Sequence, residues 1–151
     1  MRFRMDDHFG PVTEDKAPGQ EVLAGWICTD IGTPFRVLLD ALAMINDVAL
    51  GRPPYDEWSS EGYDVDFSPS GVTIRSLHGS RRSGNYSVEE VRSALEDFWR
   101  FLVEQPERRN VRREFRPDLP EWKAALLGWE DTWKRPHPYR GRLGIPETGP
   151  A

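Results

Sequence analysis

Two aspartates stand two positions apart in a stretch that alternates between polar and apolar residues. Asp64 and Asp66 alternate with apolar side chains over residues 62–68, the period typical of a half-buried β-strand. Both carboxylates then lie on one face, about 7 Å apart, where Glu57 or Glu61 could join them. Paired carboxylates can do general acid–base chemistry when their environments push their pKa values apart. A solvated strand face has the same pattern, and we favour that interpretation over catalysis.

The other residue types that carry chemistry are scattered. His8, His78 and His137 are far apart in sequence, and none has the spacing of a metal ligand with another. The single cysteine, Cys28, lies in an apolar stretch, which predicts a buried inert thiol and excludes an intrachain disulfide. No glycine-rich phosphate-binding motif is present. We therefore expect a protein that is not an enzyme and that uses no cofactor and no metal.

Charge is distributed unevenly along the chain. Residues 1–80 carry six basic against thirteen acidic residues, whereas the whole chain has a net charge of −5. An acidic half repels phosphate backbones and attracts basic proteins, so we expect no nucleic-acid ligand. Residues 108–116 hold five arginines and could bind phosphate or RNA, but only Phe115 supplies an aromatic ring there. We expect a solvated or helix-docking connector instead.

The elements around the aspartates follow from local signals. Pro69-Ser70-Gly71 has turn chemistry and is followed by a second alternating run, so residues 62–68 and 71–77 form a predicted hairpin. Residues 34–50 and 88–103 have helical apolar periodicity, and Ser87 with Glu90 forms a capping box. Residues 21–29 are a mostly apolar run, which we interpret as a further strand.

The C-terminal part adds a helix and an irregular tail. Four large apolar residues of one stripe predict a helix over residues 119–134 that packs on the rest of the chain or on a second copy of it: Trp122, Leu126, Trp129 and Trp133. Residues 136–151 have no periodicity and either wrap the surface or are loosely held. The predicted fold is α+β: an antiparallel sheet of three to five strands with helices packed on one face, plus a C-terminal tryptophan-rich helix and irregular tail.

The length of 151 residues indicates a single domain, with a core over about residues 1–104 and a helical extension over 105–151. No apolar run approaches the roughly 20 residues of a membrane-spanning helix. The N-terminus lacks the apolar core of a signal peptide, and we expect a cytoplasmic protein with no membrane partner.

A family resemblance rests on several short segments in a fixed order. They are GQEVLAGW at residues 19–26, a helix ending at Gly51, then Trp58, Gly62-Tyr63-Asp64-Val65 and Ser70-Gly71-Val72-Thr73-Ile74. This order resembles small YacL-like proteins and the immunity proteins of contact-dependent growth inhibition and polymorphic toxin systems. It covers residues 1–104 and not the segment from Arg108 onward. The resemblance implies a bacterial cytoplasmic inhibitor that binds one cognate toxin domain.

The expected partner-binding face combines acidic residues with aromatic anchors. Its members are Asp56, Glu57, Trp58, Glu61, Tyr63, Asp64 and Asp66, with Tyr55 nearby. Aromatic residues inside a charged rim are typical of interface hot spots, although Trp58 and Tyr63 could instead belong to the core. We expect an immunity protein that neutralises a basic nuclease toxin, as a monomer or a homodimer. The alternative is a non-enzymatic housekeeping or regulatory module of the same fold with an unknown ligand.

Overall fold

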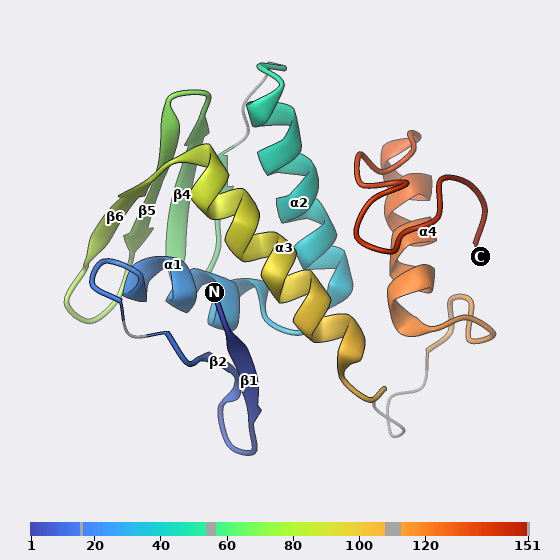
Figure 1. Ribbon diagram of the computed structural model, residues 1–151, viewed down its shortest axis with the longest axis horizontal. Coiled ribbons are helices and arrows are strands. Elements are labelled where there is room, and N and C mark those ends of the chain that lie inside the picture. The colour runs from blue at the N-terminus through green and yellow to red at the C-terminus, as the bar shows by residue number, and fades with distance from the viewer. Residues whose placement is uncertain (16, 54–56, 108–112, 151) are drawn as a thin grey trace.

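The computed structural model describes residues 1–15, 17–53, 57–107 and 113–150, and it has an α+β fold (Figure 1). Two antiparallel sheets, of two and four strands, combine with helices. The elements in chain order are β1 (Phe3–Asp6), β2 (Gly10–Thr13), α1 (Glu21–Gly25), the π-helix η1 (Trp26–Ile31), α2 (Phe35–Ala49), β3 (Glu57–Ser59), β4 (Tyr63–Ser68), β5 (Gly71–Ser76), β6 (Ser83–Tyr86), α3 (Val88–Glu104) and α4 (Glu121–Trp133).

The larger sheet has the strand order β3-β4-β5-β6, and every neighbouring pair is antiparallel. The predicted hairpin is confirmed as β4 and β5, joined by the turn at Pro69 and Ser70. Val65, Ile74 and Tyr86 on the inner face are buried. Within the described residues, helices pack on this face alone, as predicted, and none of them covers the outer face (Figure 1).

The strand predicted over residues 21–29 is wrong, because this segment is helical. It forms α1 and then η1, and ends at Gly32, whose φ is +61°. Trp26 and Ile27 are completely buried, so the segment is apolar on most of its sides. A short run of this kind has no clear helical or strand period, and composition alone then misleads.

The predicted helices α2 and α3 are confirmed and form the middle of the core. Leu38, Leu42, Leu95 and Phe98 are all completely buried. The predicted capping box is also present: the Ser87 side chain accepts from the Glu90 backbone N–H, and the Glu90 carboxylate accepts from the Ser87 N–H. The box satisfies two backbone donors that have no partner inside the helix.

The two-stranded sheet is a separate hairpin that extends from the body of the molecule (Figure 1). Phe3 anchors the base, since its ring lies 4.8 Å from that of Phe98 and 6.0 Å from that of Phe101.

Helix α4 confirms the predicted C-terminal helix, but its tryptophan stripe is only partly buried. Leu126 and Trp129 are buried, Trp122 is half-buried, and Trp133 is 54% exposed. The Trp129 Nε1–H group donates to Asp40 Oδ1 of α2 at 2.7 Å. Packing on the same chain is therefore wrong for Trp133, and its packing on a second copy stays a prediction.

Residues 134–150 have no helix or strand, yet they are docked on α2 and α3. His137 is 1% exposed, and its Nε2 lies 2.9 Å from the Leu39 carbonyl oxygen. The His137 Nδ1 accepts from the Tyr139 N–H, so Nε2 carries the proton that is donated to Leu39. Tyr139 in turn donates to Glu96 of α3 at 2.9 Å.

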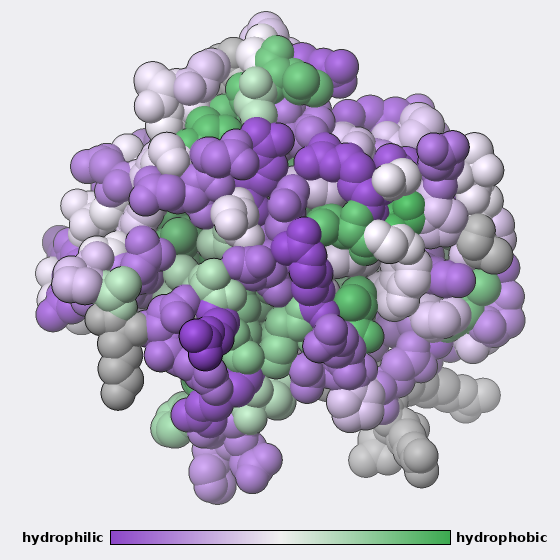
Figure 2. All heavy atoms as spheres, in the orientation of Figure 1, coloured by the Kyte–Doolittle hydropathy of each residue, from purple (hydrophilic) through white to green (hydrophobic). Residues whose placement is uncertain are grey.

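Hydrophilic side chains dominate the visible surface, with apolar patches between them (Figure 2). The patch at the top of the view lies over the end of α2, where Leu50 is 58% exposed. Among the described residues, no helix combines the length and hydrophobicity needed to cross a membrane.

Candidate functional site

The outer face of the larger sheet gathers three of the predicted acidic residues. Glu57 of β3 is directly opposite Asp66 of β4, and Ser59 is opposite Asp64. Directly opposed residues share a face of the sheet, so the three carboxylates form one group. We call the outward side chains of Glu57, Ser59, Asp64, Asp66 and Arg75 the acidic sheet face.

One arginine partly balances these charges. Arg75 of β5 is opposite Asp64 and donates from Nη1 to Asp66 Oδ2 at 2.7 Å. This hydrogen bond, followed by the charges of Asp66, Asp64 and Glu57, raises the pKa of Arg75. The Ser59 hydroxyl also donates to Asp64 Oδ1 at 2.7 Å. The acidic sheet face therefore has a net charge of about −2 on an ordered, solvent-facing surface.

Glu61 lies apart from this face, in the turn between β3 and β4. Its side chain is exposed, and its carbonyl oxygen lies 2.8 Å from His78 Nε2. The turn is held by Asp30 of η1, whose carboxylate accepts from the Ser60 hydroxyl and from the Gly62 N–H. The sequence alone does not reveal this structural role of Asp30, because it depends on the position of η1.

Trp58 and Tyr63 lie on the opposite face of the sheet from the carboxylates. The Trp58 ring packs edge-on against Trp26 at 5.5 Å, and both Trp58 and Tyr63 are half-buried against the core. Burial, and then the nearby Asp30 carboxylate, raises the pKa of Tyr63. The structure thus separates the proposed aromatic anchors from the acidic residues. Tyr55 and Asp56 lie outside the described residues.

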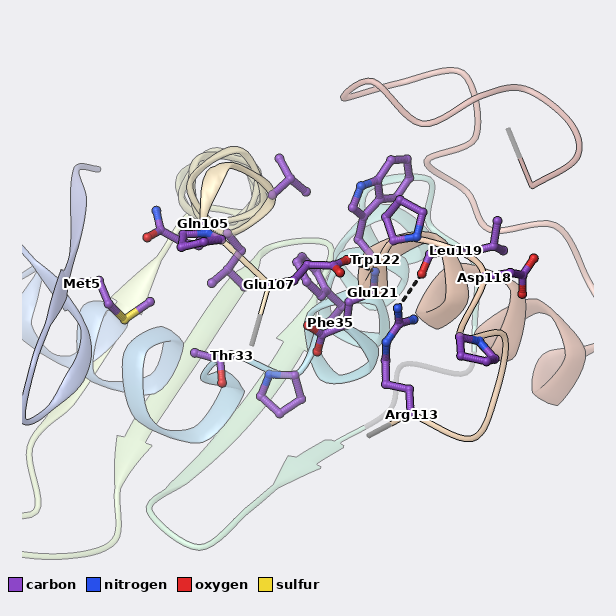
Figure 3. Close-up of a pocket in the computed structure, with 16 residues that line it drawn as sticks. Met5, Thr33, Phe35, Gln105, Glu107, Arg113, Asp118, Leu119, Glu121 and Trp122 are labelled. Carbon is purple, nitrogen blue, oxygen red and sulfur yellow. Dashed lines mark hydrogen bonds between the residues drawn. The ribbon is translucent and has the colours of Figure 1, made fainter. Parts of the chain in front are cut away.

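A cavity of about 770 Å³ lies between the end of α3, the start of α2 and residues 113–122 (Figure 3). Phe35 and Trp122 line it, and both rings pack edge-on against Trp99, at 5.5 and 5.9 Å. Its volume is in the range of small-molecule pockets. The cavity has no signal in the sequence, because its walls come from segments that are far apart in the chain.

The polar groups of this cavity mainly hold its walls in place. Glu107 Oε1 accepts from the Glu121 N–H at 2.5 Å and so caps the start of α4. Arg113 donates to the Leu119 carbonyl at 2.5 Å, as Figure 3 shows. Glu107 and Arg113 are therefore engaged by the backbone, and the lining of the cavity is mixed: the rings of Phe35 and Trp122 lie beside polar side chains such as Gln105 and Glu121.

The described residues contain no group of three or more His, Cys, Asp or Glu side chains arranged to hold a metal ion. Cys28 is half-buried, and burial raises the pKa of its thiol to about 11. The thiol is thus protonated at neutral pH and is a poor nucleophile.

Comparisons with protein-family models, with curated proteins and with solved structures found no match to this chain.

Proposed function

We propose that this protein is an immunity-type inhibitor that acts in the bacterial cytoplasm and binds a basic toxin domain through the acidic sheet face. The observation that carries the proposal is the pairing of Glu57 with Asp66 beside Asp64, on a sheet face that no described helix covers. A nuclease domain has a positive cleft for its anionic substrate, and an ordered acidic face competes for that cleft.

The distribution of charge supports the same partner class. Residues 1–80, which contain the acidic sheet face, carry six basic and thirteen acidic residues. Such an excess steers a basic protein toward this part of the molecule and raises the association rate, more strongly at low ionic strength. The family resemblance of residues 1–104 favours an immunity protein over a regulatory module with an unknown ligand.

The first step of the test is to read the frame immediately upstream of this chain, which we expect to encode a basic toxin domain; an upstream frame that encodes no such domain would count against the proposal. The wild-type chain should protect a bacterial host that expresses the domain, and calorimetry should show direct binding. The variant Glu57→Lys/Asp64→Lys/Asp66→Lys should lose protection, because like charges then face each other across the interface. Each single reversal should mainly slow association and weaken its salt dependence.

The matched control is Glu14→Lys/Glu104→Lys/Glu147→Lys, which changes the net charge equally at exposed positions outside the sheet. This variant should protect as the wild-type chain does. A sheet variant that folds and still protects would exclude the acidic sheet face. A wild-type chain that neither binds nor protects would contradict the function itself.

A further inference from the structure

Phe9 has the most exposed large apolar side chain in the described part of the chain. It is 82% exposed and lies in the turn that joins β1 to β2. This hairpin extends away from the body of the molecule, and its surface is mostly hydrophilic (Figures 1 and 2). An aromatic ring at the end of a projecting hairpin contributes nothing to the core and is accessible to a partner, and the order of the turn that carries it is what sets it apart from the other exposed apolar residues.

The turn itself is ordered rather than loose. Asp6 Oδ1 accepts from the backbone N–H groups of His8 and Phe9, at 2.9 and 3.0 Å. Arg4 donates to the other oxygen of the same carboxylate at 3.3 Å. Gly10 closes the turn with a φ of +75°, a conformation that glycine adopts without strain. The chain therefore presents Phe9 in a fixed position, which reduces the entropy lost on binding.

The base of the hairpin is anchored to the core. Phe3 packs against α3, and Pro11 of β2 is buried. The Arg2 N–H donates to Asp15 Oδ2 at 2.9 Å, which ties the two strands together below the turn. The base of the hairpin is thus held against the core, which limits the movement of the turn before binding.

We propose that residues 6–10, the hairpin tip, form a second contact site that inserts Phe9 into an apolar pocket rimmed by basic residues on a partner protein. The site rests on the proposed function in that the partner is the same basic toxin domain. Aromatic anchors that fill a pocket supply much of the energy of protein interfaces, and the surrounding charges add specificity.

The charges next to Phe9 favour a protein over a lipid surface. Asp6 and the exposed Asp7 lie in the same turn as the ring, and because Arg4 pairs with Asp6, the three charges leave the turn with a net charge of about −1. Hydrogen bonds from the His8 and Phe9 backbones lower the pKa of Asp6, so its carboxylate stays ionised even in mildly acidic solution. Carboxylates are repelled by anionic bacterial lipids but complement a basic pocket rim.

The test measures, by biolayer interferometry, how the chain of 151 residues binds the toxin domain expected from the upstream frame. Phe9→Ala should weaken binding at least about 30-fold through faster dissociation, as expected for a hot-spot residue. Phe9→Trp should retain affinity. The matched control is Phe115→Ala, which removes another exposed phenylalanine outside the hairpin and should leave affinity unchanged.

A second pair of variants tests the ordered turn. Asp6→Ala removes the acceptor for both N–H groups while Phe9 remains, and it should weaken binding more than Asp6→Asn, which keeps an acceptor. Thermal unfolding should be unchanged in Phe9→Ala, because the ring is 82% exposed.

Each contrary outcome is distinct. If the wild-type chain binds the domain and Phe9→Ala binds equally well, the hairpin tip is excluded and the acidic sheet face still stands. If the wild-type chain does not bind, the proposed function and the hairpin tip fail together. Phe9-dependent binding to vesicles of phosphatidylcholine and phosphatidylglycerol, or Phe9-dependent self-association in sedimentation, would assign the ring to a membrane or to a second copy and overturn the proposal.

Discussion

Gly25 lies close to the side chain of Tyr63, which is distant in sequence. A Cβ atom at this position would lie 2.1 Å from the Tyr63 hydroxyl oxygen. Helix propensity alone would predict that Gly25→Ala stabilises the protein by about 1 kcal/mol. We expect destabilisation instead, by about 1–3 kcal/mol in urea unfolding, because overpacking outweighs propensity.

The variant Tyr63→Phe removes the clashing oxygen and supplies the control for this prediction. In a double-mutant cycle, Gly25→Ala should cost less in the Tyr63→Phe background than in the wild-type background. If Gly25→Ala lowers the free energy of unfolding equally in both backgrounds, the Tyr63 hydroxyl is not the cause of the destabilisation.

His137 should make stability depend on pH. Burial lowers its pKa from 6.5 to about 4, so the unfolded chain takes up a proton at a higher pH than the folded chain. This contribution is fully present above pH 6.5 and is lost as the pH falls toward 4. The total loss in the free energy of unfolding should be about 3 kcal/mol.

Urea unfolding at several pH values between about 7 and about 4 measures this effect. His137→Gln should flatten the dependence, whereas His78→Gln, which changes an exposed histidine, should retain it. If the free energy of unfolding depends on pH equally in His137→Gln and in the wild-type chain, His137 is not the group responsible.

The alternation of β4 indicates which of its side chains face the core. Side chains along β4 alternate between the two faces of the sheet. Tyr63 is two positions from the buried Val65 and next to Asp64, so its inward position follows from the sequence. The position of Trp58 does not, because it depends on the pairing of Trp58 with Val65 across two strands. Cross-strand register is set by tertiary contacts that a single segment does not show.

At the level of elements, predictions succeeded where the signal is local. The start of α3 is determined by Ser87 and Glu90 within one turn, and the β4–β5 turn by its own proline and glycine. The prediction for the segment of α1 and η1 failed, because the run is short and buried on most sides and so has no clear period, and its contacts with the sheet are distant in sequence. Asp30 of η1, for example, binds the turn between β3 and β4.

Helix α4 allows a matched comparison of two tryptophans. Trp129 is 1% exposed and donates to Asp40, whereas Trp133 is 54% exposed. Trp129→Ala should lower the free energy of unfolding by about 3–5 kcal/mol. Trp133→Ala should change it by less than about 1 kcal/mol, as surface substitutions do.

Deletion of residues 117–151 extends this comparison to the whole element. The truncated chain should aggregate, because the apolar surfaces that Leu126 and Trp129 cover become exposed. Size-exclusion chromatography and thermal unfolding measure the outcome. A truncated chain that stays soluble, monomeric and equally stable would show that α4 does not support the core.

At the level of the whole molecule, the docked tail was the least predictable feature. Its partners are distant in sequence: Arg135 binds Asp47, and Arg142 lies 3.3 Å from Glu96. Residues 134–150 have no period that indicates a buried face, so only the assembled α2 and α3 surface explains why His137 and Tyr139 are buried.

The contacts of residues 134–150 also determine which part of the molecule unfolds first. Among the described residues, every hydrogen bond from residues 134–150 to another element goes to α2, α3 or α4, and none goes to a sheet. We therefore expect residues 134–150 to detach as a cooperative unit while the four-stranded sheet stays folded. In native-state hydrogen exchange, amides of the tail then exchange through a sub-global opening that added salt makes easier, while those of β4 and β5 exchange only when the whole chain unfolds.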